Sequence, residues 1–384
     1  MTGGALPGLR VLDLSRVLAG PLCAQMLADH GAEVVKVEAP SGDETRRWGP
    51  PFVDEAETTS AYYQGLNRNK ANVVLDLRLE KDRETLYAMI ARADVVVENF
   101  KAGTMRRWGL EYESRLAGDF PRLVYCRISG YGVDGPMGGR PGYDAVLQAY
   151  GGLMSVNGEP DGDPLRVGVP IVDITAAHQA FAGVLLALME RATSGRGQLV
   201  DITLSDAVVS LLHPHSAAYL ASGAIPVRTG AAHPTVAPYQ VFRCEGEQLL
   251  FVAAASDAQF AGLVDVLGHP HVAGDPRFAR NRDRVVNRTA LLELIEPLFL
   301  LRDADELGAA LLARGVPAGP VNDVGAALSA AQVRHRQMVV ADGAYRGVGV
   351  PIKLSRSGAR PARAPAALGA DTARILAEHG FDLG

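Results

Sequence analysis

Residues Arg10–Glu38 read RVLDLSRVLAGPLCAQMLADHGAEVVKVE, and this stretch decides the fold. Arg10–Leu14 is a short run of leucine and β-branched residues, as in a buried strand. Leu22–His30 has the pattern of a helix, and Gly31 directly after it is a common helix terminator. Ala32–Glu38 is a second strand-like run. A strand, a helix and a strand within about 30 residues form a βαβ unit, whose parallel strands must be covered by helices.

The same alternation continues along the first half of the chain. Further strands are expected at Asn72–Leu77, Asp94–Glu98, Leu123–Ile128 and Gln198–Thr203, with Lys81–Arg92 as an intervening helix. We therefore predict an α/β protein whose large domain contains a Rossmann-like open parallel sheet.

The second half of the chain predicts a smaller body. One helix is expected at Asp206–Leu220, and the Gly-, Pro- and His-rich segment Ala224–Tyr239 after it is typical of a linker or a functional loop. We assign residues 226–316 to a small α+β domain and residues 1–220 to the large domain. The segment 317–384, with a last helix at Asp371–His379, is expected to return to the large domain.

Composition and charge exclude several classes of protein. The 384 residues carry a net charge of −5 and the pI is near 6.0, which argues against a nucleic-acid partner. Cys23, Cys126 and Cys244 are odd in number and lack CxxC spacing, which favours neither a disulfide framework nor a zinc site. No run reaches the roughly 18 uninterrupted apolar residues of a membrane helix, and no secretory signal pattern opens the chain. We expect a cytoplasmic protein with no metal and no membrane partner.

The opening unit could belong to a nicotinamide dehydrogenase. Glu38 ends the second strand, where a dinucleotide-binding fold carries its ribose-binding acid. The first turn, Ser15–Pro21, has however one glycine, whereas the GxGxxG fingerprint needs three to bring the backbone to a pyrophosphate. The sequence therefore disfavours a nicotinamide cofactor.

Ten segments, two of them within the opening stretch, occur in an order that resembles the class III CoA-transferase family, from about residue 6 to the C-terminus. They are VLDLSRVLAGP (11–21), GAEVVKVE (31–38), GDETR (42–46), NKANVVLDL (69–77), ADVVVENF (93–100), GYGVDGP (130–136), PGYD (141–144), VGVPIVDIT (167–175), GRGQLVDI (195–202) and VPAGPV (316–321). Each segment alone is weakly specific, but ten in order over nearly the whole chain are strongly so. The resemblance implies an enzyme that moves CoA from an acyl-CoA to a carboxylic acid, without a tightly bound cofactor.

The resemblance implies that Asp173, in the segment VGVPIVDIT, is the catalytic nucleophile. From spacing alone, an aspartate between an apolar run and a helix is more simply an N-cap. The two roles are compatible, because a helix N-terminus stabilises an ionised carboxylate. We expect Asp173 to have both roles. Gly130, Gly151 and Gly152 are candidate sites of close backbone approach to the reacting groups.

The family pattern also implies contacts to CoA. Carried over residue by residue, these contacts fall on Leu18, Ala19, Asn99, Phe100, Arg107 and Tyr131. An arginine pairs well with phosphate, and an aromatic ring can pack on adenine or pantetheine. Ala39 stands where some family members have an arginine, so one contact is missing or has moved to Arg46, Lys101 or Arg106.

Two alternatives to a transferase remain. The same fold resembles acyl-CoA racemases, whose proton-transfer pair needs a histidine where this chain has Tyr143. A tyrosine, with an ordinary pKa near 10, is a poor substitute. The other alternative is a non-catalytic CoA-binding protein, against which the retention of Asp173 argues.

The segments at residues 49–52 (GPPF), 158–162 (GEPDG) and 233–242 (HPTVAPYQVF) look like those of the succinyl-CoA-dependent members that act on dicarboxylates. A second carboxylate would need a cation, for which Arg46, Arg47, Arg166 and His233 are candidates. The family resemblance also implies an interlocked homodimer.

Overall fold

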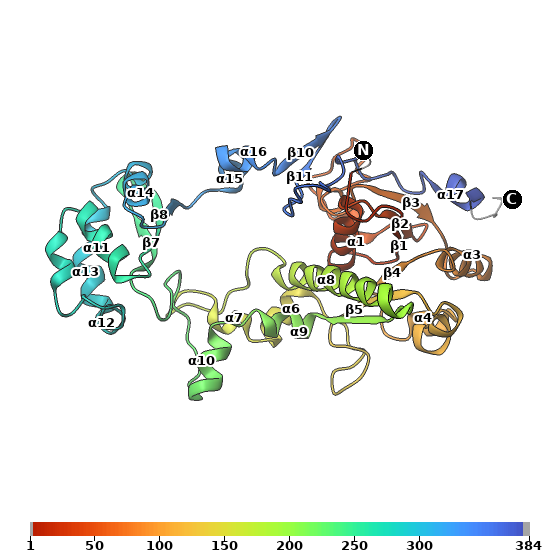
Figure 1. The fold of residues 1–384 in the computed structure, drawn as a ribbon, viewed down its shortest axis with the longest axis horizontal. Coiled ribbons are helices and arrows are strands. Elements are labelled where there is room, and N and C mark those ends of the chain that lie inside the picture. The colour runs from red at the N-terminus through yellow and green to blue at the C-terminus, as the bar shows by residue number, and fades with distance from the viewer. Residues whose placement is uncertain (1–2, 379–384) are drawn as a thin grey trace. The chain divides into compact units, whose positions relative to one another are not determined.

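A computed structural model describes residues 3–378 (Figure 1). Its main feature is a six-stranded sheet with the order β3-β2-β1-β4-β5-β6, in which every neighbouring pair is parallel. The strands are β1 (Arg10–Asp13), β2 (Glu33–Glu38), β3 (Lys70–Val74), β4 (Val95–Glu98), β5 (Val124–Ser129) and β6 (Leu199–Thr203). The predicted α/β class is confirmed. Strand order reverses between β1 and β4, and ligands of open α/β sheets bind outside the carboxyl ends of the strands at such a point.

Both faces of this sheet are covered, which explains the nearly continuous apolar runs of its strands. Successive residues alternate between two cores: Val11 packs in the core under α1 (Ala19–Asp29) and α8 (Ile171–Ser194), whereas Leu12 packs in the opposite core. The opposite core also holds Leu86 of α3 (Glu80–Ile90). Helices α1 and α8 pack side by side on their face of the sheet (Figure 1).

Shorter elements lie outside this sheet. They are η1 (Glu44–Arg47), α2 (Ala61–Gln64), α4 (Thr104–Arg107), η2 (Tyr112–Leu116), α5 (Ala117–Asp119), α6 (Asp144–Tyr150), α7 (Leu153–Val156), α9 (Leu204–Ser210), α10 (His215–Ser222), α16 (Ala331–His335), β10 (Val339–Asp342), β11 (Tyr345–Val348) and α17 (Thr372–Glu378). Two of them, α7 and α10, cross the boundary between the two compact units described below. The prediction of a single helix at Asp206–Leu220 is wrong, because the chain forms two helices there, α9 and α10. Pro214 lies between the two helices and has no backbone N–H to continue a helix. The last residue of the final predicted helix, His379, lies outside the described residues.

The chain divides into two compact units. The first holds the described residues up to Leu153, Arg166–Ser216 and those from Ala331 onward; the second holds Met154–Leu165 and Ala217–Ala330. The second unit is therefore larger than the predicted 226–316. The added segment Met154–Leu165 is joined to this unit by hydrogen bonds. Gly230 N donates to Gly158 O at 3.1 Å, and the Arg228 guanidinium donates to Glu159 O at 3.2 Å.

The predicted C-terminal segment began at residue 317, but the described chain rejoins the first unit only from Ala331 onward. Its contacts with the edge strand β3 show how it is held there. Asn72 N donates to Asp371 Oδ2 at 2.9 Å, and Gly369 N donates to Asn72 Oδ1 at 2.7 Å.

The second unit has its own α+β core. Its antiparallel sheet has the order β7-β8-β9, with strands β7 (Tyr239–Arg243), β8 (Leu249–Ala253) and β9 (Ala318–Pro320). Its helical elements are η3 (Glu245–Glu247), α11 (Asp257–Val266), η4 (Pro270–Gly274), α12 (Asn281–Val286), α13 (Arg288–Phe299), α14 (Ala304–Ala313) and α15 (Val324–Ser329). Phe242 and Phe299 stack in its core with ring centroids 4.1 Å apart.

Within the described residues, α8 is the one helix long and apolar enough to cross a membrane by length and composition alone. The core helix of a globular domain passes the same test. Ala176, Ala180 and Val184 of α8 are fully buried in the sheet core, so the fold accounts for the apolar residues on this side of the helix. One third of the apolar window is buried in the single chain.

Candidate active site

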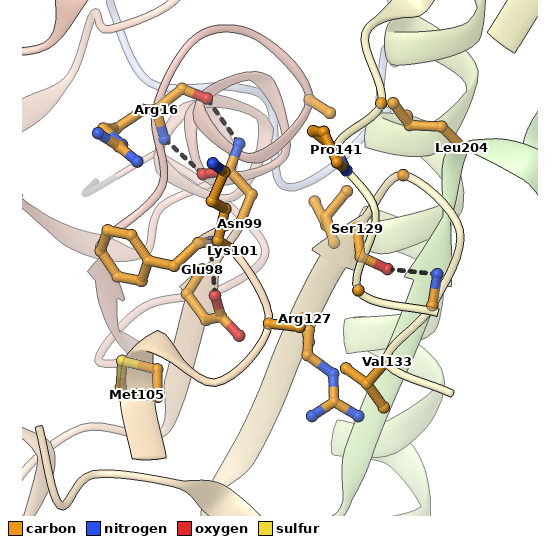
Figure 2. A pocket seen from close by; sticks show the side chains of 18 of the residues that line it. Arg16, Glu98, Asn99, Lys101, Met105, Arg127, Ser129, Val133, Pro141 and Leu204 are labelled. Atoms are coloured by element: carbon orange, nitrogen blue, oxygen red, sulfur yellow. Dashed lines mark hydrogen bonds between the residues drawn. The ribbon is translucent and has the colours of Figure 1, made fainter. Parts of the chain in front are cut away.

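A cavity of about 650 Å³ opens at the carboxyl ends of β1, β4 and β5, at the point where the strand order reverses (Figure 2). Its walls come from the loops that follow these strands, and from the start of α9 after β6. The volume lies in the range of small-molecule and cofactor sites. The parallel topology therefore brings segments far apart in the sequence to one place.

Four of the predicted CoA contacts line this cavity: Leu18, Ala19, Asn99 and Phe100. The amide of Asn99 is already paired, because Oδ1 accepts from Arg16 N at 2.8 Å and Nδ2 donates to Arg16 O at 2.7 Å (Figure 2). Asn99 thus joins the loop after β4 to the loop after β1.

The other two predicted CoA contacts, Arg107 and Tyr131, do not line the cavity. The Arg107 guanidinium donates to Thr104 Oγ1 at 3.0 Å, and the Tyr131 ring packs edge-on against Tyr150. The neighbouring Arg106 does line the cavity, but its guanidinium forms an ion pair with Glu111 at 2.7 Å.

Four other cations line the cavity. Arg127 forms an ion pair with Glu113 at 2.9 Å, and the remaining three are Arg16, Lys101 and Arg140. Within residues 3–378, no carboxylate lies within ion-pair distance of Arg16, Lys101 or Arg140. The Arg16 guanidinium lies 5.4 Å from the centroid of the Phe100 ring. Sequence reasoning missed Arg16 and Arg140, although Arg16 directly follows the first strand, where an α/β fold places its ligand.

Asp173, the predicted nucleophile, also lines the cavity and lies half-buried in the first turn of α8. It is not the N-cap, so that part of the expectation is wrong: the N-cap is Pro170. The free N–H groups of this helix end are instead taken by Asp144, whose Oδ2 accepts from Val172 N at 2.8 Å and from Asp173 N at 3.2 Å. Asp144 in turn is held by Gln148, whose Nε2 donates to Oδ1 at 2.6 Å.

The pKa of Asp173 is raised in this arrangement, whereas the sequence predicted that a helix N-terminus would stabilise its ionised form. Burial in the cavity wall, together with the smaller effect of the negative charge of Asp144, raises the pKa of the Asp173 carboxyl to about 7. Because Asp144 accepts the hydrogen bonds of the N–H groups at the start of α8, these groups do not stabilise the charge of Asp173 in the way the sequence suggested. A desolvated carboxylate with a high pKa is a stronger nucleophile whenever it is ionised.

A second buried acid, Glu98, lies on the cavity wall at the end of β4 (Figure 2). Its Oε2 accepts from Phe100 N at 2.7 Å, and burial raises the pKa of its carboxyl to about 7.

Glycines allow two loops to approach closely beside the cavity. A Cβ on Gly130 would lie 2.8 Å from Gly142 N, so neither loop could keep its place with a larger residue at Gly130. Gly151 and Gly152, the other glycine candidates, do not line the cavity. Tyr143, in the position of the racemase histidine, lines it and is exposed.

The cations suggested for a second carboxylate are not cavity residues. Arg46 is buried, and its guanidinium donates to both oxygens of Glu38 at 2.8 Å, so it is not free to bind a ligand. Glu38 stands in the position of a ribose-binding acid, but its carboxylate is already hydrogen-bonded to Arg46 and accepts from Tyr63 Oη at 2.7 Å. Within residues 3–378 no cluster of three or more His, Cys, Asp or Glu side chains could hold a metal.

Comparison with known proteins gives a consistent result. The model of CoA-transferase family III matches residues 6–372. Succinate–glutarate CoA-transferase of Agrobacterium fabrum is 39% identical, with 97% of this chain and 95% of that protein covered. Succinyl-CoA:mesaconate CoA-transferase of Haloarcula hispanica is 37% identical, with 99% and 98% covered. The crystal structure of a CAIB/BAIF family protein from Brucella suis is similar with a TM-score of 0.89 and 41% identity, over 98% of this chain and 100% of that one.

Proposed function

The chain belongs to CoA-transferase family III, and from this premise we propose that it moves CoA from succinyl-CoA to a dicarboxylic acid through covalent catalysis at Asp173. The observation that carries the proposal is the position of Asp173. It is the half-buried carboxyl in the first turn of α8 on the wall of the cavity, with its pKa raised to about 7.

The transfer requires four substitutions at carbonyl carbon and no net proton transfer. An oxygen of the Asp173 carboxylate attacks the thioester carbonyl, and the C–S bond breaks to give a mixed anhydride and the CoA thiolate. The thiolate attacks the aspartyl carbonyl and releases the donor acid, which leaves an aspartyl-CoA thioester. The acceptor carboxylate then expels the thiolate, and the thiolate takes the acceptor acyl group from the second anhydride. Asp173 is regenerated as a carboxylate.

The charge distribution of the cavity supports CoA as the shared substrate. Arg16, Lys101 and Arg140 are cavity cations without carboxylate partners among the described residues, and the phosphates of CoA supply the complementary charge. Leu18, Ala19 and Phe100 add apolar surface beside them, suited to pantetheine or adenine. Arg107 and Tyr131 remain expectations from the family resemblance.

The identity of the acceptor rests on the relatives and on three segments. The proteins from Agrobacterium and Haloarcula carry glutarate and mesaconate in their names, both of them dicarboxylates. The segments at 49–52, 158–162 and 233–242 resemble this branch of the family. A matrix of acyl-CoA donors against mono- and dicarboxylic acids tests it, and a clear preference for monocarboxylates would refute the dicarboxylate assignment.

Trapping tests the covalent step. With succinyl-CoA and hydroxylamine but no acceptor acid, the enzyme should yield a hydroxamate at Asp173, located by peptide mass spectrometry. Asp173→Asn should yield no adduct and no transfer while remaining folded. Asp206→Asn is the matched control, because Asp206 lies in the first turn of α9 but does not line the cavity, and this variant should retain both. An Asp173→Asn variant with wild-type transfer would refute the proposal.

Other properties follow from the family resemblance as predictions. We expect an interlocked homodimer, and α8 exposes Leu186 and Met189, which are 67% and 71% accessible in the single chain. A monomer in sedimentation would contradict the dimer. We also expect a cytoplasmic enzyme with CoA as substrate and no tightly bound cofactor. Cys23, Cys126 and Cys244 are all free and buried, which suits a reducing compartment.

The racemase alternative makes a different prediction. A racemase would exchange the α-hydrogen of an acyl-CoA with solvent deuterium in the absence of any acceptor acid. Because Tyr143 replaces the histidine of the proton-transfer pair, we expect no such exchange.

A further inference from the structure

The loop between β1 and α1 has no regular hydrogen bonding, yet side chains from elsewhere hold its backbone. Ser15 N donates to Asp13 Oδ1 at 3.1 Å, and Ser15 O accepts from Lys36 Nζ at 2.8 Å. Both backbone groups of Arg16 pair with Asn99. The backbone of this loop is thus fixed from strands β1 and β2 and from the end of β4.

The conformation fixed in this way is one that the chain does not adopt readily. Val17 has a φ of +67°, in the left-handed region, which β-branched residues avoid. Val17 N points to Asp43 Oδ1 at 3.5 Å. Such a backbone persists only where its surroundings impose it, and strained residues of this kind concentrate at functional sites. Arg16, Val17, Leu18 and Ala19 all line the cavity.

A fully buried ionic cluster lies behind the loop. It contains two acids and two lysines: Asp13, Asp43, Lys36 and Lys70. Lys70 Nζ lies 2.8 Å from Asp13 Oδ2, and Lys36 Nζ lies 3.3 Å from Asp43 Oδ2 and 3.8 Å from Asp13 Oδ2. Lys70 Nζ also donates to Pro21 O at 2.8 Å, so the cluster also holds the first turn of α1, which follows the loop.

Stability alone does not account for this cluster. Four charges without solvent contact are expensive to desolvate, and apolar residues of similar volume are often equally stable in such places. None of the four side chains lines the cavity, so none can contact a ligand there. What the cluster does supply is a set of fixed donors and acceptors aimed at the loop backbone.

We propose that Asp13, Lys36, Asp43 and Lys70 are positioning residues that hold the loop Ser15–Ala19 in the conformation that binds CoA. The inference rests on the proposed function, which makes this cavity the CoA site. A loop already ordered in its bound conformation loses less conformational entropy on binding, so the cluster should raise CoA affinity without touching CoA.

The double variant Lys36→Met/Asp43→Asn tests the proposal. It removes one cation and one anion together, so the buried cluster keeps no net charge. In the wild type, Asp43 Oδ1 accepts a hydrogen bond from Thr45 N at 3.0 Å, and the side-chain oxygen of an asparagine at position 43 can accept the same bond. The matched control is Arg68→Met/Asp29→Asn, which removes a buried ion pair of 2.7 Å in the same unit. Among the residues that the structure describes, the hydrogen bonds of these two side chains go to each other, to Val348 O and to Asn69, and not to the loop. CoA affinity is measured by titration calorimetry, and amide exchange is followed on a peptide covering residues 14–22.

We expect Lys36→Met/Asp43→Asn to bind CoA about tenfold more weakly, with faster exchange in the loop. The control should bind CoA as the wild type does. A folded test variant with wild-type affinity would overturn the proposal, and so would an equal loss in both variants. If the double variant does not fold, Lys36→Gln, which keeps one donor, should still weaken binding measurably, and unchanged affinity would overturn the proposal. A wild-type protein that does not bind CoA would instead refute the proposed function itself.

Discussion

Replacing Asp144 by asparagine should move the pH dependence of the reaction to lower pH. Asp144 shares the N-terminus of α8 with Asp173, and its charge is the second cause, after burial, of the raised pKa of Asp173. With a pKa of about 7, Asp173 is charged in about half of the wild-type molecules at pH 7 and in about one tenth at pH 6. The wild-type kcat/KM should therefore fall nearly tenfold for each pH unit below the midpoint.

Asp144→Asn removes the neighbouring charge but keeps an oxygen that can accept from Val172 N and Asp173 N. The pKa of Asp173 should fall, so the variant should retain a larger fraction of its activity at pH 6 than the wild type does. Loss of the charged cap should also lower the free energy of unfolding by about 1 kcal/mol.

The assay is the initial rate of CoA transfer at low succinyl-CoA from about pH 5 to pH 9, with saturating acceptor. Urea unfolding at each pH serves as the control for stability. A kcat/KM midpoint that stays in place or rises in Asp144→Asn would refute the electrostatic coupling of the two carboxyls. A wild-type profile without a midpoint near pH 7 would refute the role of ionised Asp173.

Three further predictions concern the same unit. Because the folded-state pKa of Asp173 is raised from 3.8 to about 7, the wild type should lose stability as pH rises from about 4 to about 7 and keep that loss at higher pH. Asp173→Asn should therefore raise Tm relative to the wild type at pH 8 and much less at pH 4, measured by calorimetry. Arg140→Met should weaken CoA binding and reduce its dependence on salt, and equal salt dependence in wild type and variant would contradict a phosphate contact. Arg46→Met should lower the free energy of unfolding by about 3–5 kcal/mol at pH 7, because Glu38, whose pKa lies at about 2, would lose its buried partner. That loss should shrink as pH falls below the ordinary pKa of glutamate, and a constant loss would contradict the ion pair.

The sequence predicted the sheet because its signals are local. The run from Arg10 to Glu38 contains a complete βαβ unit, and a short continuous apolar run is the local pattern of a strand that is covered on both faces. Handedness and covering helices then restrict the topology to very few choices. The division of the predicted helix Asp206–Leu220 was missed although Pro214 marks it in the sequence.

Sequence signals that place residues after strands and at helix starts are local, but the pairing of side chains in the site is not. Leu18, Ala19, Asn99, Phe100 and Asp173 line the cavity, because each follows a strand end or begins a helix that the sequence could place. Which side chains at those places are free depends on partners distant in the chain, and a single sequence carries no signal for that pairing.

By itself the sequence determined the fold class, the family and the identity of the candidate nucleophile. Only the tertiary structure decided the electrical state of that nucleophile, because Asp144, distant in sequence, takes the helix N–H groups that would otherwise stabilise its charge. The tertiary structure also decided which cations can bind a ligand. Arg46 forms an ion pair with Glu38, whereas Arg16 and Arg140 line the cavity with no carboxylate partner in the described part of the chain. The reason is that pKa values and free hydrogen-bonding groups are set by burial and by neighbours in space, whereas secondary structure is set largely by neighbours in sequence.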